Sequence, residues 1–125
     1  MTRILFVCHG NICRSPMAEF VMKDLVKKAG LSSQFHIESA ATSREEIGNP
    51  IYPPARRKLT EHGISCGGHA ARELTKSDYN AFDLLIGMDQ LVKVARNLEI
   101  RETGKVLTCD DFEGNHFAFM DGGVG

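Results

Sequence analysis

The chain has 125 residues and should form one domain with a single hydrophobic core. Its formal net charge of −1 at pH 7 argues against nucleic acid or an anionic membrane as a general partner. No apolar run approaches the roughly 20 residues that span a bilayer, and the N-terminus lacks a signal-peptide pattern. Four unevenly spaced cysteines are typical of a reducing compartment, so we expect a cytoplasmic protein.

The first two predicted elements are a buried strand and an amphipathic helix. Residues 3–7 are nearly all apolar, which is typical of a strand that is buried on both faces. Ser15 can cap a helix over residues 15–29, Pro16 suits its first turn, and Gly30 can end it. The apolar stripe of this helix is expected to be Met17, Ala18, Val21, Met22, Leu25, Val26 and Ala29.

The remaining elements alternate between strand and helix. A short strand is expected over residues 34–39, and a helix over residues 54–62 that Gly63 ends. Thr75 and Asp78 have capping-box spacing, so a short helix should begin there. Further elements are a strand at 82–86, a helix at 90–98 and a strand at 105–108. This alternation predicts an α/β fold with a parallel sheet, whose ligand lies at the carboxyl ends of the strands.

The segment between the first strand and the first helix has the pattern C-x5-R-[ST], from Cys8 to Ser15. A short loop before a helix can direct several backbone N–H groups at one point, where the helix N-terminus adds positive potential. The same field favours a thiolate at Cys8, and Arg14 has a planar fork that suits two phosphate oxygens. We interpret this segment as a phosphate-binding loop with a cysteine nucleophile. Its phosphate-binding residues are expected to be His9, Gly10, Asn11, Ile12, Cys13 and Arg14.

This loop resembles that of the low-molecular-weight protein tyrosine phosphatases, which have Gly-Asn within the same pattern and Ser-Pro after it. The similarity continues through residues 38–41, 59–64 and 82–89. It implies a three-layer, flavodoxin-like α/β fold with a four-stranded parallel sheet and the phosphate-binding loop after the first strand. It divides the chain into a phosphatase-like domain, residues 1–112, and an atypical glycine-rich tail, residues 113–125.

The resemblance implies hydrolysis of phosphotyrosine or another aryl phosphate through a cysteinyl-phosphate intermediate. The catalytic residues would be Cys8 as nucleophile, Arg14 on the phosphate oxygens and Ser15 as hydrogen-bond donor to the sulfur. The expected partners are a phosphorylated protein or a small aryl phosphate, with inorganic phosphate as a competitive ligand. No metal and no cofactor is expected.

A support network behind the loop is also implied by the resemblance. The family asparagine that matches Asn11 is hydrogen-bonded to a serine and a histidine, which correspond to Ser39 and His69. Asp89 matches an acid that pairs with this histidine. From the residues themselves, we expect Gly10 or Asn11 to adopt a positive φ, because loops that bind anions usually need one such position.

Two thiols lie within the loop. In the family, a cysteine at the position of Cys13 can form a reversible disulfide with the nucleophile, so redox regulation is one interpretation. The alternative is a small residue that fills space beneath the loop. Cys66 and Cys109 are expected to be buried as small apolar residues.

The sequence departs from the family in three places. In the family, the general acid is the aspartate of an Asp-Pro dipeptide, and this sequence contains no such dipeptide. Asp121 is a weak candidate to replace that acid. Asp110 and Asp111 are expected, from their positions, to have a structural role. Loss of a general acid typically reduces the rate by 10²–10⁴. The usual final helix is also missing, which would expose the sheet and favour a homodimer, domain swapping or low stability. Finally, the loop after residue 41 has no aromatic residue beside the expected cleft, and Ile47 and Tyr52 are the nearest substitutes.

Two other functions fit the same loop. One is a non-catalytic module that binds phosphate or a phosphoprotein. The other is arsenate reduction, which needs two further cysteines close together. Cys66 and Cys109 are far apart in the sequence, which disfavours this second alternative.

Overall fold

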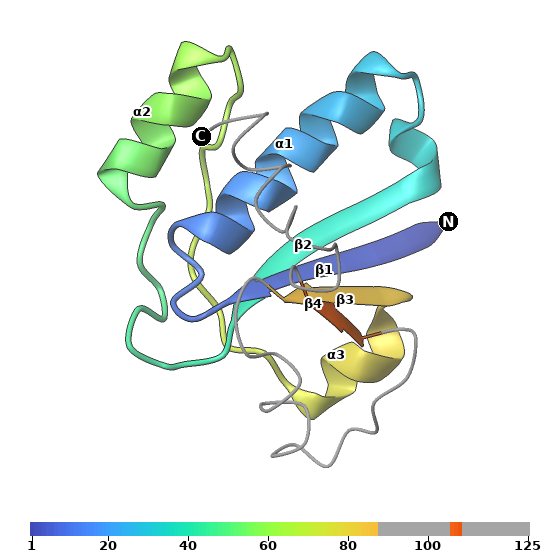
Figure 1. The fold of residues 1–125 in the computed structure, drawn as a ribbon, viewed down its shortest axis with the longest axis vertical. Coiled ribbons are helices and arrows are strands. Elements are labelled where there is room, and N and C mark those ends of the chain that lie inside the picture. The colour runs from blue at the N-terminus through green and yellow to red at the C-terminus, as the bar shows by residue number, and fades with distance from the viewer. Residues whose placement is uncertain (88–105, 109–125) are drawn as a thin grey trace.

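In a computed structural model of the protein, the described residues are 1–87 and 106–108 (Figure 1). The elements are β1 Thr2–Cys8, α1 Arg14–Lys28, the 3-10 helix η1 Ser32–Gln34, β2 Phe35–Ala41, α2 Pro53–Glu61, α3 Lys76–Ala81, β3 Leu84–Gly87 and β4 Val106–Thr108. Each expected strand and helix in the described part is present, with its ends shifted by one or two residues. The helix expected over residues 90–98 and the domain boundary expected at residue 112 lie outside it.

The strands form one parallel sheet in the order β2-β1-β3-β4, which confirms the predicted four-stranded α/β architecture. Cys8 at the end of β1 pairs with Ala41 at the end of β2, and Val7 pairs with Gly87 at the end of β3. The carboxyl ends of three strands therefore meet at one edge of the sheet. The loop after β1 leaves the sheet at this edge, as expected for a ligand site in such a fold.

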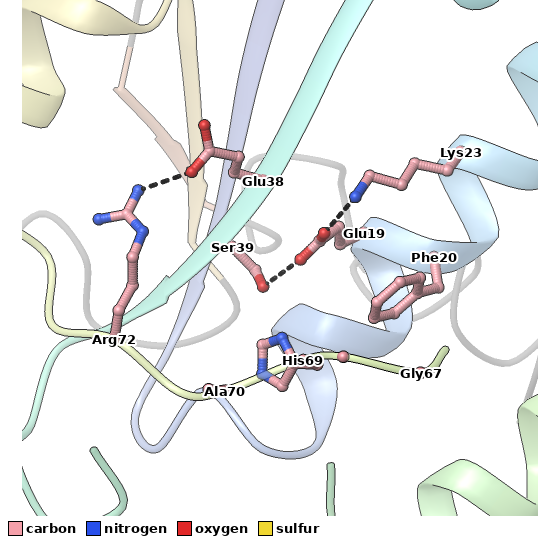
Figure 2. Close-up of a pocket in the computed structure, with 10 residues that line it drawn as sticks. Glu19, Phe20, Lys23, Glu38, Ser39, Gly67, His69, Ala70 and Arg72 are labelled. Carbon is pink, nitrogen blue, oxygen red and sulfur yellow. Dashed lines mark hydrogen bonds and ion pairs between the residues drawn. The ribbon is translucent and has the colours of Figure 1, made fainter. Parts of the chain in front are cut away.

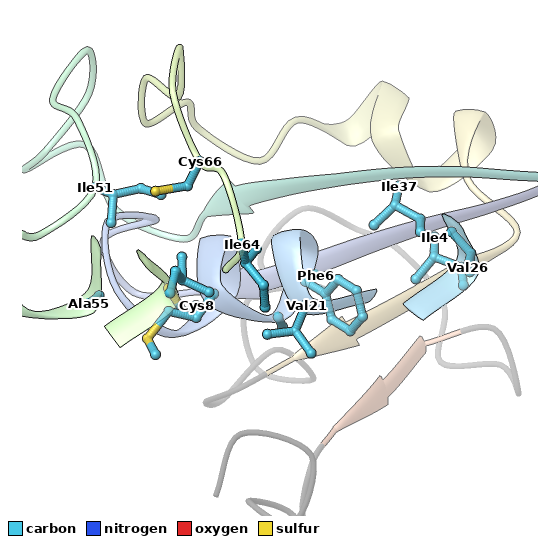
Figure 3. Packing of buried hydrophobic residues seen from close by; sticks show 13 residues of the cluster. Ile4, Phe6, Cys8, Val21, Val26, Ile37, Ile51, Ala55, Ile64 and Cys66 are labelled. Carbon is cyan, nitrogen blue, oxygen red and sulfur yellow. The ribbon is translucent and has the colours of Figure 1, made fainter. Parts of the chain in front are cut away.

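Helices cover both faces of the sheet, so the expected three layers are present (Figure 1). On one face, Ile4 and Phe6 of β1 pack with Val21 and Val26 of α1 and with residues of α2 (Figure 3). On the other face, residues of β1 and β3 pack with Leu74 and Phe82, which flank α3. Burial on both sides explains why β1 reads as a continuous apolar run rather than an alternating one.

Helix α1 differs from the expectation in its cap and in its buried face. Its N-cap is Cys13, without a side-chain cap bond, so the prediction that Ser15 caps the helix is wrong: Ser15 is fully buried within the first turn. Leu25 and Ala29, both expected in the apolar stripe, are exposed, Leu25 by 50%, whereas Val26 beside Leu25 is buried. Glu19, outside the expected stripe, is also buried.

The expected glycines at the ends of α1 and α2 and the expected capping box of α3 are present. Gly30 and Gly63 have positive φ directly after α1 and α2, where a helix end favours glycine. Thr75 and Asp78 form the expected capping box of α3. None of the helices in the described ranges is both long and apolar enough to cross a membrane.

The packing predicts different costs for two leucine truncations. Leu5 of β1 has no exposed surface, so Leu5→Ala should lower the free energy of unfolding by about 2–5 kcal/mol through lost burial and a residual cavity. Leu25→Ala is the matched control and should change it by about 0.5 kcal/mol or less. Urea denaturation measures both values. Equal losses for the two variants would contradict this packing.

Candidate active site

The expected phosphate-binding residues lie at the carboxyl edge of the sheet. Five of these six residues form the connection between β1 and α1; the sixth begins the helix and is followed by the candidate catalytic residue Ser15. Asn11 has a φ of 59°, while Gly10 is outside the positive-φ region, so the asparagine supplies the left-handed position that one of the two was expected to adopt. The six residues are His9, Gly10, Asn11, Ile12 and Cys13 in the loop and Arg14 in α1.

The sulfur of Cys8 lies at the centre of this loop. The backbone N–H groups of Asn11 and Ser15 point at it, with N···S distances of 3.3 and 3.4 Å. The hydroxyl oxygen of Ser15 is 3.0 Å from the same sulfur. Three groups that can donate hydrogen bonds therefore surround a buried sulfur at the start of a helix, an arrangement that can hold a thiolate.

The side-chain amide of Asn11 connects the loop to the elements behind it. Its nitrogen donates to the hydroxyl oxygens of Ser15 and Ser39, at 2.8 Å each, and its oxygen accepts from the backbone N–H of Arg72 at 3.1 Å. The backbone oxygen of Asn11 lies 2.7 Å from Nε2 of His69, which must therefore carry the proton. Because Asn11 has no exposed surface, these bonds satisfy an otherwise costly buried amide.

The structure thus brings together three members of the expected support network, namely Asn11, Ser39 and His69. Asp89 and Asp121 lie outside the described residues. Among the described residues, no group of three or more histidine, cysteine, aspartate or glutamate side chains could hold a metal ion.

Two residues of the network were missed from the sequence. Glu19 accepts a hydrogen bond of 2.5 Å from the hydroxyl of Ser39, and its other oxygen is 2.5 Å from Nζ of Lys23 (Figure 2). A glutamate between apolar residues of α1 was the available signal for its burial. Arg72 contributes through its backbone N–H, which no sequence pattern marks.

A cavity of about 280 Å³ lies beside this network and is mostly polar. Figure 2 shows Glu19 and Ser39 pointing toward one another at its wall, with His69 nearby. The cavity therefore lies at the rear of the loop, beside the buried support network. Its lining residues are Glu19, Phe20, Lys23, Glu38, Ser39, Gly67, Gly68, His69, Ala70 and Arg72.

The segment after β2 borders the loop. Its backbone is bonded to the loop, because Ser43 donates to the oxygen of His9 at 3.0 Å and Tyr52 donates to that of Ile12 at 2.7 Å. The imidazole of His9 also lies 3.1 Å from the carboxylate of Glu45. Backbone bonds at both ends of the segment therefore hold it against the phosphate-binding loop.

The side chains of this bordering segment supply little aromatic surface. Ile47 and Tyr52, the expected substitutes for a family aromatic residue, are 45% and 48% exposed. A Cβ at Gly10 would lie 3.4 Å from Cγ of Glu46, an ordinary van der Waals contact, so Glu46 lies directly beside the phosphate-binding loop.

The three described cysteines are free. Cys66 is buried in the core cluster, as expected, while Cys109 lies outside the described residues. Cys13 is half-buried; burial raises the pKa of its thiol, the neighbouring Cys8 raises it further, and Arg14 lowers it. Cys13 should therefore be a protonated thiol at neutral pH.

Comparison with known proteins agrees with this geometry. A family model described as low molecular weight phosphotyrosine protein phosphatase matches residues 3–119. The chain belongs to this family. The human phosphatase of that name is 43% identical over 106 residues, which are 85% of this chain and 65% of the human one. The chain therefore spans just under two thirds of the length of this curated relative.

Two further relatives bear on the fold. Bacillus subtilis YfkJ, named a low molecular weight protein-tyrosine-phosphatase, is 44% identical over 89 residues, which are 71% of this chain and 57% of YfkJ. Its crystal structure has a TM-score of 0.86 at 36% identity, covering 92% of this chain and 74% of that one. A Drosophila arginine phosphatase has a TM-score of 0.77 at 31% identity, covering 90% of this chain and 73% of that one. These similarities confirm the expected fold.

The environment of Cys13 predicts how its alkylation depends on pH. Because neighbouring Cys8 raises the pKa of the Cys13 thiol, Cys8→Ser should shift the alkylation of Cys13 to lower pH. Iodoacetamide labelling, located by fragmentation mass spectrometry, measures this shift. Cys66 is the internal control and should label equally in both proteins. An unchanged profile, or a shift to higher pH, would contradict the prediction.

Proposed function

We propose that the protein hydrolyses phosphotyrosine or related aryl phosphate monoesters, with Cys8 as the nucleophile. The observation that carries this proposal is the buried sulfur of Cys8, which faces two backbone N–H groups and one hydroxyl at the start of α1. Family membership supports the same activity. The substrate of the human relative, as its name states, is a phosphotyrosine protein.

In the proposed first step, the Cys8 thiolate attacks phosphorus in line with the ester oxygen. A sulfur–phosphorus bond forms, the phosphorus–oxygen ester bond breaks, and the aryl oxygen leaves with the bonding electrons. The loop N–H groups and Arg14 are proposed to bind the three equatorial oxygens, whose charge redistributes during the transfer. Ser15 is proposed to donate a hydrogen bond that keeps the sulfur anionic before attack and helps it to leave afterwards.

In the proposed second step, water attacks the cysteinyl-phosphate. A new phosphorus–oxygen bond forms, the sulfur–phosphorus bond breaks, and the sulfur leaves as the thiolate. The product is inorganic phosphate, and the protons of the attacking water pass to the phosphate or to solvent. Inorganic phosphate, as the product, should also compete with substrate for the loop. This chemistry requires neither a metal nor a cofactor.

Protonation of the leaving oxygen sets the range of substrates. Asp121 is proposed as a weak candidate for the general acid. Without a positioned acid, we expect aryl phosphates with stable leaving groups to react well and alkyl phosphates poorly. Phosphoarginine is a useful competing substrate, because one structural relative is an arginine phosphatase.

We also propose that Cys8 and Cys13 can be oxidised together by hydrogen peroxide, giving a disulfide and two molecules of water. Both cysteines are free in the structure and belong to the same loop. Such a disulfide would block the nucleophile reversibly, because a dithiol reductant restores both thiols. A cytoplasmic location, which we also propose, would supply that reductant.

A homodimer is a separate proposal, based on the expected absence of the final helix that covers the sheet in the family.

The two alternative functions, arsenate reduction and non-catalytic phosphate binding, require different features of the structure. Arsenate reduction needs a relay of accessible cysteines, and Cys66 is buried in the core cluster. A binding module needs the loop alone, so kinetics must distinguish it from an enzyme.

Kinetics with p-nitrophenyl phosphate between about pH 5 and 8 test the proposed activity. Cys8→Ser should abolish turnover, because serine is a much weaker nucleophile. Arg14→Ala should reduce kcat/KM by about 10³ or more, because it removes charge stabilisation from the transferring phosphoryl group. Arg57→Ala, an exposed position on α2, is the matched control and should keep native turnover.

Two outcomes would contradict the proposed activity. Phosphate binding by the native protein without turnover would indicate a binding module. Near-native turnover by Arg14→Ala would remove this arginine from the mechanism. Parallel assays with phosphotyrosine and phosphoarginine peptides would show which class of substrate the loop prefers.

A further inference from the structure

Glu19 is a buried carboxylate that the proposed reaction does not use. It is 7% exposed, on the face of α1 that packs behind the phosphate-binding loop. One oxygen accepts from the hydroxyl of Ser39 and the other from Nζ of Lys23 (Figure 2). A buried charge with two short, specific hydrogen bonds is costly to desolvate, so its placement requires a reason.

The hydrogen bond that Ser39 donates to Glu19 fixes the direction of the hydrogen bond between Ser39 and Asn11. An ionised carboxylate can only accept, so the single hydroxyl proton of Ser39 points at Glu19. The oxygen of Ser39 is then an acceptor for the side-chain N–H of Asn11. A chain of hydrogen bonds with one direction therefore runs from the loop to the buried carboxylate.

The amide of Asn11 carries this direction to the nucleophile. Its oxygen accepts from the backbone N–H of Arg72, so the amide cannot reverse without facing two donors toward each other. Its second N–H donates to the hydroxyl oxygen of Ser15. The proton of Ser15 then remains for the sulfur 3.0 Å away, which makes Ser15 a donor to Cys8.

We propose that Glu19 is a positioning residue: through Ser39 and Asn11 it orients the Ser15 hydroxyl as a hydrogen-bond donor to the Cys8 sulfur. The inference rests on the proposed function, in which this sulfur is the attacking and leaving group. A negative charge at the end of the chain also polarises each bond along it, which strengthens the hold on the Asn11 amide.

The charged groups around Glu19 do not replace Ser39 as its partner. Lys23, one turn later on α1, bonds to the oxygen that Ser39 does not use. His69, Arg72 and Glu38 line the same cavity, but His69 donates to the loop backbone, and Arg72 binds Glu38 and Asp78. The Ser39 hydroxyl therefore remains with Glu19.

The proposal is tested by the direction in which Glu19→Ala shifts the pH dependence of Cys8 alkylation. A negative charge behind the loop repels a thiolate, so charge repulsion alone predicts that Glu19→Ala makes Cys8 more reactive toward alkylation at low pH. Positioning predicts the opposite, because Ser39 loses its acceptor and the hold on Asn11 and Ser15 weakens. These two effects of one substitution can be separated by a single measurement.

The experiment follows alkylation of Cys8 by iodoacetamide against pH, located by fragmentation mass spectrometry, together with kcat and KM. Glu19→Ala should shift the profile to higher pH and lower both kcat and the alkylation rate near pH 6 by about tenfold, with little change in KM. Glu19→Gln should stay close to the native protein, because its amide oxygen can still accept from Ser39.

Asp24→Ala is the matched control. Asp24 also pairs with a lysine four residues later on α1, at 2.8 Å, but it makes no described bond to the network. In Asp24→Ala, the pH dependence of Cys8 alkylation should therefore match that of the native protein. Ser39→Ala should reproduce the shift of Glu19→Ala, and the double variant should show no further shift if Glu19 acts through Ser39.

An unchanged or lower-pH profile for Glu19→Ala would overturn the proposal, as would additive shifts in the double variant. If Glu19→Ala does not fold, an unchanged profile for Ser39→Ala overturns it equally. Failure of the proposed function has a different signature: the native protein would not turn over substrate, while the alkylation shifts would still follow the prediction.

Discussion

The buried amide of Asn11 is the constraint on which the candidate active site depends. It joins the loop to Ser15 on α1, to Ser39 on β2 and to the backbone of Arg72. Because it is fully buried at a positive φ, removing any partner would leave a polar group without compensation and release a strained loop. The position of the loop around Cys8 is therefore determined by elements that lie far apart in the sequence.

The parallel sheet makes this constraint possible. Its register places Cys8 beside Ala41, so that Ser39, two residues earlier on β2, lies behind the loop. Burial of β1 on both faces holds the strand that carries the nucleophile, while α1 starts directly after the loop and directs its N-terminus toward the sulfur. The fold thus supplies both the rigid support and the positive potential that a phosphate-binding cysteine needs.

Much of this arrangement could be predicted from the sequence, because its signals are local. The apolar run of β1, the glycines after α1 and α2, and the capping box at Thr75 and Asp78 each indicated an element that is present. Family resemblance indicated the contacts of Asn11 with Ser39 and His69. Long-range contacts had no local signal: the hydroxyl of Ser15 bonds to Cys8 and Asn11 rather than capping α1, and the burial of Glu19 depends on its approach to β2.

The central claim is that the sulfur of Cys8 becomes covalently bonded to phosphorus. Acid quenching of the protein during turnover of p-nitrophenyl phosphate, followed by peptide fragmentation, tests it directly. The account predicts that the peptide with Cys8 carries the mass of one phosphoryl group, that the modification lies on Cys8 rather than Cys13, and that Cys8→Ser abolishes it. Turnover of the substrate without a phosphorylated Cys8, under conditions in which hydrolysis of the intermediate limits the rate, would contradict the account.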